Sequence, residues 1–152
     1  MADYAGAVAA IRTHFSSHWN ETAIALPNTP PPSDPWPPSG PWVFVEVMST
    51  GSEMRGAGKP GDQVWLTRGY VHVQIFVPKD YGVEESERLA TAAGEVFRAK
   101  TIYADGSGAK VMFGAPLPNG LFVSERSSTG SETEGNQFGV TCSIPFEFFF
   151  RA

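Results

Sequence analysis

Residues 68–77 read RGYVHVQIFV, and this stretch decides the fold class. Side chains of two kinds alternate along it with a period of two residues, which is typical of a β-strand whose faces have different surroundings. An aliphatic face of this kind predicts a strand that lies against a core. The aliphatic face comprises Val71, Val73, Ile75 and Val77, and the other comprises Tyr70, His72, Gln74 and Phe76.

Two segments flanking this strand have apolar residues at helical spacing. In residues 3–19, Asp3 is placed to cap the first turn. In residues 83–100, acidic residues occupy the first turns and basic residues the last, as the helix dipole favours. The expected core positions are Tyr4, Val8, Ile11, Phe15 and His18 or Trp19 in the first helix, and Leu89, Ala93, Val96 and Phe97 in the second.

Further strands are predicted from runs rich in aromatic and β-branched residues. They cover residues 42–48, 109–113, 121–127 and 137–150. The order α-β-β-α-β-β-β predicts an α+β fold with one mostly antiparallel sheet and two helices packed on it. Because 152 residues is the usual length of one domain, we expect a single domain over residues 1–152.

Two segments have compositions that interrupt the regular elements. Residues 27–41 contain eight prolines, which lack the backbone N–H and restrict the preceding residue. An extended segment outside the sheet is predicted there. Residues 49–67 are rich in glycine and poor in apolar residues, so a long mobile loop or hairpin arm is predicted between the first two strands.

The overall composition disfavours several classes of function. The net charge of -5 argues against nucleic acid as a specific partner, because phosphate binding uses clustered Lys and Arg. A single cysteine, Cys142, permits no intrachain disulfide and suits a reducing cytoplasm. The amino-terminal apolar stretch is short and ends at Arg12, so we expect no signal peptide. No apolar run is long enough to predict a membrane span.

Histidine and cysteine give only weak signals for chemistry. His14 and His18 have the spacing of a zinc-binding helix, but Phe15 stands where a metalloprotease has its glutamate. Solvated or edge-packed histidines are the simpler interpretation. Cys142 would need His72 beside it to act as a nucleophile, whereas alternation places the thiol on an apolar face and favours a buried, inert group.

Two further motifs are also poor matches to known sites. Residues 56–61, GAGKPG, resemble a phosphate-binding loop, but Pro60 follows the lysine where Ser or Thr is required. Residues 30–38, PPPSDPWPP, resemble a polyproline ligand, but they lie between a helix and a strand. A stiff arm laid over its own domain or over a neighbour fits them better. We therefore expect no enzymatic activity, no metal and no cofactor.

The arrangement of the whole chain resembles that of the phage tail terminator-like family, which is related to the lambda tail terminator and to gene transfer agent tails. The resemblance begins in residues 19–28, WNETAIALPN, after a short first helix and before the Pro-rich segment that ends in Trp42-Val43. It continues through Val71–Val77 into Pro78 and Gly82, a helix ending in Val96-Phe97, strands near 109–113 and 121–123, and a closing strand over 140–150.

The resemblance implies a structural subunit at the head-tail interface of a phage-like particle, assembled in the bacterial cytoplasm. Such a subunit forms a ring, typically a hexamer, that caps the tail tube, stops its polymerisation and joins it to head connector proteins. An acidic chain is compatible with a lumen that lets DNA pass without holding it. The alternatives are a head completion or minor tail adaptor protein and, from a different class, a small ligand-binding or enzymatic domain.

The closing strand suggests where such a ring would make contact. Phe146, Phe148, Phe149 and Phe150 place aromatic groups on both faces, so the face away from the core needs a cover from the same chain or from another subunit. The residues expected at an intersubunit contact are Trp36, Trp65, Tyr70, His72, Phe76 and Phe149.

Overall fold

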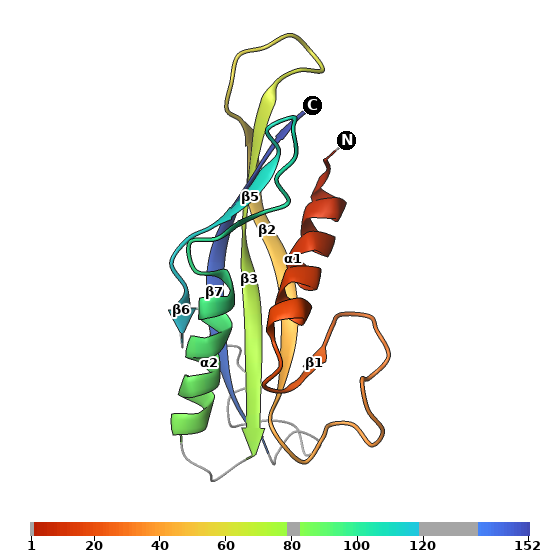
Figure 1. Cartoon of the computed structure of the whole chain (residues 1–152), viewed down its shortest axis with the longest axis vertical. Coiled ribbons are helices and arrows are strands. Elements are labelled where there is room, and N and C mark those ends of the chain that lie inside the picture. Colours follow the sequence, from red (N-terminus) through yellow and green to blue (C-terminus); the bar gives the residue numbers. More distant parts are fainter. Residues whose placement is uncertain (1, 79–82, 119–136) are drawn as a thin grey trace.

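The computed structural model describes residues 2–78, 83–118 and 137–152 as two helices and a curled sheet (Figure 1). The predicted α+β class is confirmed. The elements are α1 (Tyr4–His18), β1 (Ala23–Ala25), β2 (Trp42–Met54), β3 (Val64–Pro78), α2 (Glu84–Phe97), β4 (Thr101–Ile102), β5 (Lys110–Phe113), β6 (Leu117–Pro118) and β7 (Gln137–Arg151).

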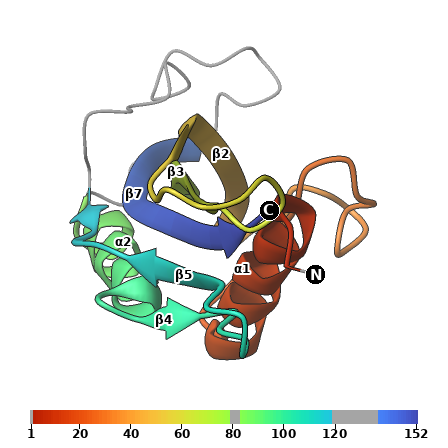
Figure 2. The ribbon, with the colours of Figure 1, turned by 90° about the horizontal axis from the view of Figure 1, so that it is seen from above.

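The three long strands β2, β3 and β7 form the centre of the sheet. The strand order is β1-β2-β3-β7-β5-β4, and β6 pairs with β7 outside this path. Only β1 and β2 run parallel among these pairs, so the sheet is mostly antiparallel as predicted. The sheet curls, and both helices lie on the same side of it (Figure 2).

The core lies between the helices and this side of the sheet. Phe97 of α2 is fully buried and packs between Phe15 of α1 and Phe113 of β5, with ring centroids 5.8 and 4.7 Å away. The predicted aliphatic face of β3 is buried against this cluster, which confirms the alternation of residues 68–77. Its buried neighbours include Val43, Val45, Leu89, Ala93, Val140, Cys142, Ile144, Phe146 and Phe148.

Both helices begin where the sequence predicts, with small corrections at their ends. The Asp3 carboxylate accepts a hydrogen bond from the backbone N–H of Gly6 at 2.7 Å, which is the expected cap of α1. Of the two alternatives at the end of this helix, Trp19 is buried and His18 is exposed. Helix α2 ends at Phe97, so the basic residues predicted for its last turn follow the helix.

Strands β2 and β3 are longer than predicted and continue as a hairpin arm beyond the helices (Figure 1). The hairpin alternative for residues 49–67 is therefore confirmed. A β-bulge between Ser49 and Gly51 shifts the pairing register where the arm begins. The carboxyl terminus is tied to the arm, because Gln63 and Ala152 exchange two backbone hydrogen bonds of 3.0 and 3.1 Å.

Two other predicted segments differ from the structure or lie outside it. The Pro-rich segment lies outside the sheet, as predicted, but turns and bends make it a loop and not an extended segment (Figure 1). Its Trp36 packs on Trp42 of the same chain, as expected for a segment laid over its own domain. The strand predicted for residues 121–127 lies outside the described residues.

Candidate interaction surface

The side of the sheet turned away from α1 and α2 carries most of the residues predicted at a contact. We call it the second face. Directly paired residues of antiparallel strands point to the same side, so the strand registers define this face. It includes Trp42, Phe44, Glu46 and Met48 of β2, Leu66, Arg68, Tyr70, His72, Gln74 and Phe76 of β3, Met112 of β5, Leu117 of β6, and Gln137, Thr141, Ser143, Pro145, Glu147 and Phe149 of β7.

One end of the second face is an aromatic cluster closed within the chain. The ring of Trp42 stacks on Phe76 with centroids 4.3 Å apart, and Trp36 from the Pro-rich loop meets Trp42 edge-on at 4.8 Å. The indole N–H of Trp42 donates to the side-chain oxygen of Gln137 at 2.9 Å. Trp36 and Phe76, both predicted at an intersubunit contact, therefore already have partners in their own chain.

The middle of the second face is a polar row across three strands. His72 is paired in register with Glu46 on one side and with Ser143 on the other. Its Nδ1 lies 3.1 Å from the Ser143 hydroxyl, and its ring is stacked against that of Tyr70 with centroids 5.8 Å apart. Burial lowers the pKa of His72 below its ordinary value, and the negative charge of Glu46 opposes that shift.

Serine, histidine and a carboxylate are also the residue types of a nucleophilic triad. Ser143 has no accessible surface, so a substrate cannot reach its hydroxyl in this conformation. The row therefore serves as a hydrogen-bonded contact that joins β3 to β7.

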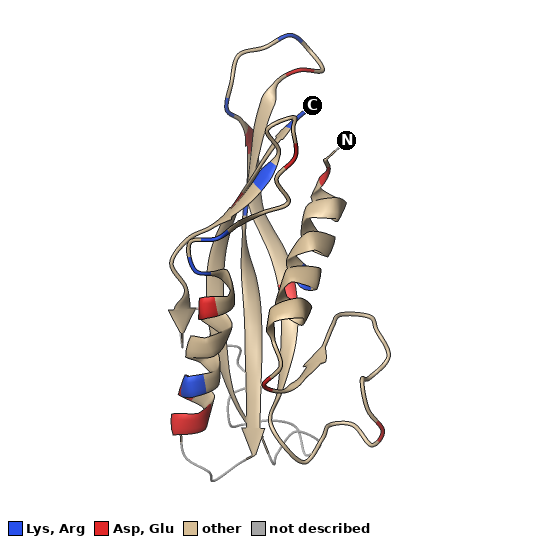
Figure 3. Cartoon of the chain, viewed as in Figure 1, with Lys and Arg blue, Asp and Glu red and all other residues tan. Residues whose placement is uncertain are grey.

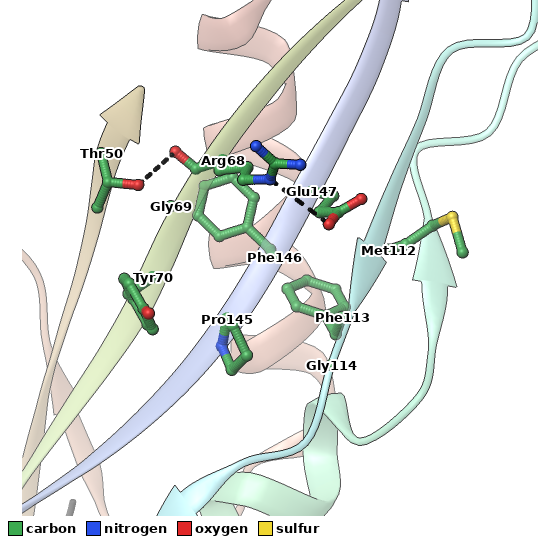
Figure 4. Close-up of a pocket in the computed structure, with 10 residues that line it drawn as sticks. All are labelled: Thr50, Arg68, Gly69, Tyr70, Met112, Phe113, Gly114, Pro145, Phe146 and Glu147. Atoms are coloured by element: carbon green, nitrogen blue, oxygen red, sulfur yellow. Dashed lines mark hydrogen bonds and ion pairs between the residues drawn. The ribbon is translucent and has the colours of Figure 1, made fainter. Parts of the chain in front are cut away.

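Beside this row the second face is hollowed and apolar (Figure 4). We call this hollow the second-face pocket. It encloses about 410 Å³. Met112, which is 40% exposed, belongs to its wall, and Met48 and Leu117 are other exposed apolar residues of the second face. The pocket is lined by Thr50, Arg68, Gly69, Tyr70, Met112, Phe113, Gly114, Pro145, Phe146 and Glu147.

A charge network borders the pocket where the arm begins. Arg68 lies 2.8 Å from the carboxylate of Glu53 and 3.7 Å from that of Glu147. Arg55 shares the same oxygen of Glu53 at 3.2 Å. All four side chains are about half exposed, and charged groups continue along the arm (Figure 3).

The two remaining predicted contact residues lie on opposite sides of the sheet. Phe149 is on the second face, half-buried, with the Lys110 ammonium 5.9 Å from its ring centroid. Trp65 was expected in a mobile loop, but it belongs to β3 and pairs with Phe150 on the helix side. Its indole N–H donates to the carbonyl of Ala152 at 3.3 Å. The six predicted residues therefore do not form one patch.

Sequence reasoning missed the pocket itself. Arg68, Met112 and Glu147 come from three strands, and none of them has an unusual local pattern. The exposure of Met112 could have been predicted, because alternation in the strand 109–113 places it on the face opposite the buried Val111 and Phe113. The exposed Met48 likewise follows from alternation in the predicted strand 42–48.

The histidine and cysteine candidates are accounted for by local contacts. His14 Nε2 lies 3.0 Å from the carbonyl oxygen of Val96, and His18 Nδ1 lies 2.8 Å from that of His14. Cys142 is paired in register with Val73 on the core side, so it points away from the face of His72. Burial raises the pKa of this thiol to about 12.

Metal-ligand clusters and membrane-spanning helices are both absent from the part of the chain that the structure describes. No group of three His, Cys, Asp or Glu side chains in residues 2–78, 83–118 and 137–152 could hold a metal ion. Neither α1 nor α2 is long and apolar enough to cross a membrane.

Comparisons with known proteins identify a similar fold but no family. No protein-family model and no curated protein matches the chain. A solved structure of a protein whose name states no function matches with a TM-score of 0.51 and 18% sequence identity. The match covers 92% of this chain and 94% of that chain. At this identity the similarity concerns the fold alone.

Proposed function

We propose that the chain is a tail-terminator-type subunit of a phage-like particle and acts by assembly, not by catalysis. In this role, copies form a ring that caps the tail tube, stops its polymerisation and offers a surface to the head connector. The proposal rests on the resemblance of residues 19–28 and of the element order to the tail terminator-like family.

The observation that carries the proposal is the second face with its adjoining arm. Met48, Met112 and Leu117 are each at least 40% exposed on one side of a central sheet. Large apolar side chains exposed on one side of a sheet are typical of protein contact surfaces. The arm extends beyond the domain to which it belongs, so it can reach a neighbouring subunit (Figure 1).

The outer edge of β2 supports the same conclusion. Within the described residues, β1 is the strand that pairs with this edge, and it covers only Trp42, Val43 and Phe44. From Val45 to Met54, this edge of β2 has no strand partner among the described residues, so its backbone groups are open to pairing with another chain.

Electron microscopy of tail-tube assembly tests the proposal. Tube subunits polymerise with and without the purified chain, and the length distribution is scored. We expect shorter, uniform tubes that carry a ring at one end. Tubes of unrestricted length would reject the terminator role, and rings bound only to head connectors would favour a head completion or adaptor protein.

The pocket favours a second candidate, a small ligand-binding domain. A hollow of about 410 Å³ with apolar walls and a few charged groups has the size of a ligand site. Screening metabolites by thermal shift separates the two candidates. A strong, saturable shift that Met112→Lys abolishes would support ligand binding.

A further inference from the structure

We infer that the apolar side of the hairpin arm docks in the second-face pocket of another copy of the chain. This inference rests on the proposed function, since it names the surfaces that would join neighbouring subunits of the ring. The arm side is formed by Met54 and Trp65, which we call the arm patch.

The arm patch is an exposed continuation of the core side of the sheet. Met54 pairs with Trp65, and Trp65 pairs with Phe150, so the three side chains share one face. Phe150 stacks on the buried Phe148 with ring centroids 5.0 Å apart. Met54, the last residue of β2, is 51% exposed at the outer end of this apolar run. The arm that contains it extends beyond both helices (Figure 1).

The pocket opens on the opposite side of the sheet from the arm patch. Tyr70 and Arg68 of β3 point to the second face, whereas Trp65 of β3 points to the helix side. One chain therefore cannot place its own arm patch in its own pocket. A contact between two different surfaces of identical chains is heterologous, and repeating it produces a ring when the rotation closes.

Charge complementarity selects a second copy as the occupant. Glu147 at the pocket is 47% exposed, and its 3.7 Å distance from Arg68 exceeds the roughly 2.7–2.9 Å of a charge-assisted hydrogen bond. The segment between β2 and β3 at the end of the arm carries a matching cation. Lys59 has no ion-pair partner among the described residues, whereas Arg55 already lies 3.2 Å from Glu53. A docked arm would bring Lys59 to Glu147.

Disulfide trapping between two variants of the full chain tests the contact. Met54→Cys and Met112→Cys proteins are mixed and oxidised. Because both variants have the same mass, the disulfide between positions 54 and 112 is quantified from its linked peptides after digestion. A disulfide requires Cα atoms within about 7 Å, so it reports proximity. The native Cys142 is fully buried, so it should not form a disulfide in this experiment. Val83→Cys is the matched control, because Val83 is 50% exposed and Met54 51% exposed.

We expect at least about tenfold more dimer from Met54→Cys with Met112→Cys than from Val83→Cys with Met112→Cys, a ratio that corresponds to about 1.4 kcal/mol. Equal yields from the two mixtures would overturn the inference. Lys59→Glu alone should weaken self-association roughly two- to fivefold, as expected for an exposed ion pair, and Glu147→Lys in the same chain should restore it. A double variant that self-associates more weakly than either single variant would also overturn the inference.

The two proposals fail in distinguishable ways. Rings that cap tubes without any preference for the disulfide between cysteines introduced at positions 54 and 112 would reject the arm contact and retain the terminator role. Efficient trapping of that disulfide in a protein that never limits tube length would retain the contact and reject the terminator role.

Discussion

Replacing Gly69 with alanine should destabilise the fold, because the sheet leaves no room for a side chain there. A Cβ atom at this position would overlap the carbonyl oxygen of Met48 and lie 2.7 Å from Cζ of Phe146. The first neighbour is backbone, and the second is a ring 2% exposed in the core. Neither can move without displacing β2 or repacking the aromatic residues around it.

The expected magnitude follows from two opposing effects. Overpacking a dense interior costs about 1–3 kcal/mol. Alanine recovers about 0.5–1 kcal/mol because it loses less backbone freedom on folding than glycine. Because the overlap is with backbone, the cost lies in the upper part of its range, about 2–3 kcal/mol, and subtracting about 1 kcal/mol leaves a net loss of about 1–2 kcal/mol. For a chain of this size each kcal/mol lowers Tm by about 2–4 °C. We therefore expect Tm to fall by about 2–8 °C.

Thermal unfolding followed by circular dichroism measures this change. Gly51→Ala is the matched control, since a Cβ atom at Gly51 would have no heavy atom within 4 Å. That variant should be unchanged or slightly stabilised, because it gains the entropic benefit without the overlap. A Gly69→Ala protein as stable as wild type would refute the close packing of β2, β3 and Phe146.

Three further variants or reagents test other parts of the structure. Cys142 should resist thiol reagents at pH 8 in the native chain and react fully in urea, because burial raises its pKa to about 12. The absorbance of the released label measures the reaction, and rapid labelling of the native chain would contradict the burial of this thiol. The lowered pKa of His72 means that the unfolded chain binds a proton first as pH falls, so stability should decline below about pH 6.5. Lowering the pH from 7.5 to 5.5 should shift the urea midpoint less in His72→Gln than in wild type or in the exposed control His18→Gln. Equal shifts in all three proteins would contradict the role assigned to His72. Phe97→Ala should cost about 3–5 kcal/mol in urea unfolding, and a loss under 1 kcal/mol would mean that the aromatic core is packed differently.

The spacing of apolar residues predicted the long helices and strands that bury one face against the core. The alternation of residues 68–77 gave the correct buried side of β3, and helical spacing gave Leu89, Ala93, Val96 and Phe97 as the core side of α2. The alternation in a strand is informative because a shift of one residue in its pairing register would expose every apolar side chain on the buried face. Strands β1, β4 and β6 have two or three residues each, too few to produce a period.

The candidate surface was only partly predictable, because it depends on how distant strands pair. Alternation correctly placed Tyr70, His72 and Phe76 opposite the core, but the stacking of Trp42 on Phe76 requires the register of β2 against β3. The bulge at Ser49 and Gly51 interrupts the alternation of β2, so the direction of Met54 does not follow from the sequence. The pocket likewise combines residues of four strands, β2, β3, β5 and β7.

The mass of the particle that the full chain forms, alone and on tail-tube ends, tests the central claim of assembly through the second face and the arm. Light scattering and mass photometry should find a closed oligomer at an integer multiple of 16.4 kDa, and Met112→Lys should return it to the single-chain mass with the fold intact. A 16.4 kDa species at every concentration and on every tube end, or an oligomer unchanged by Met112→Lys, would contradict the account.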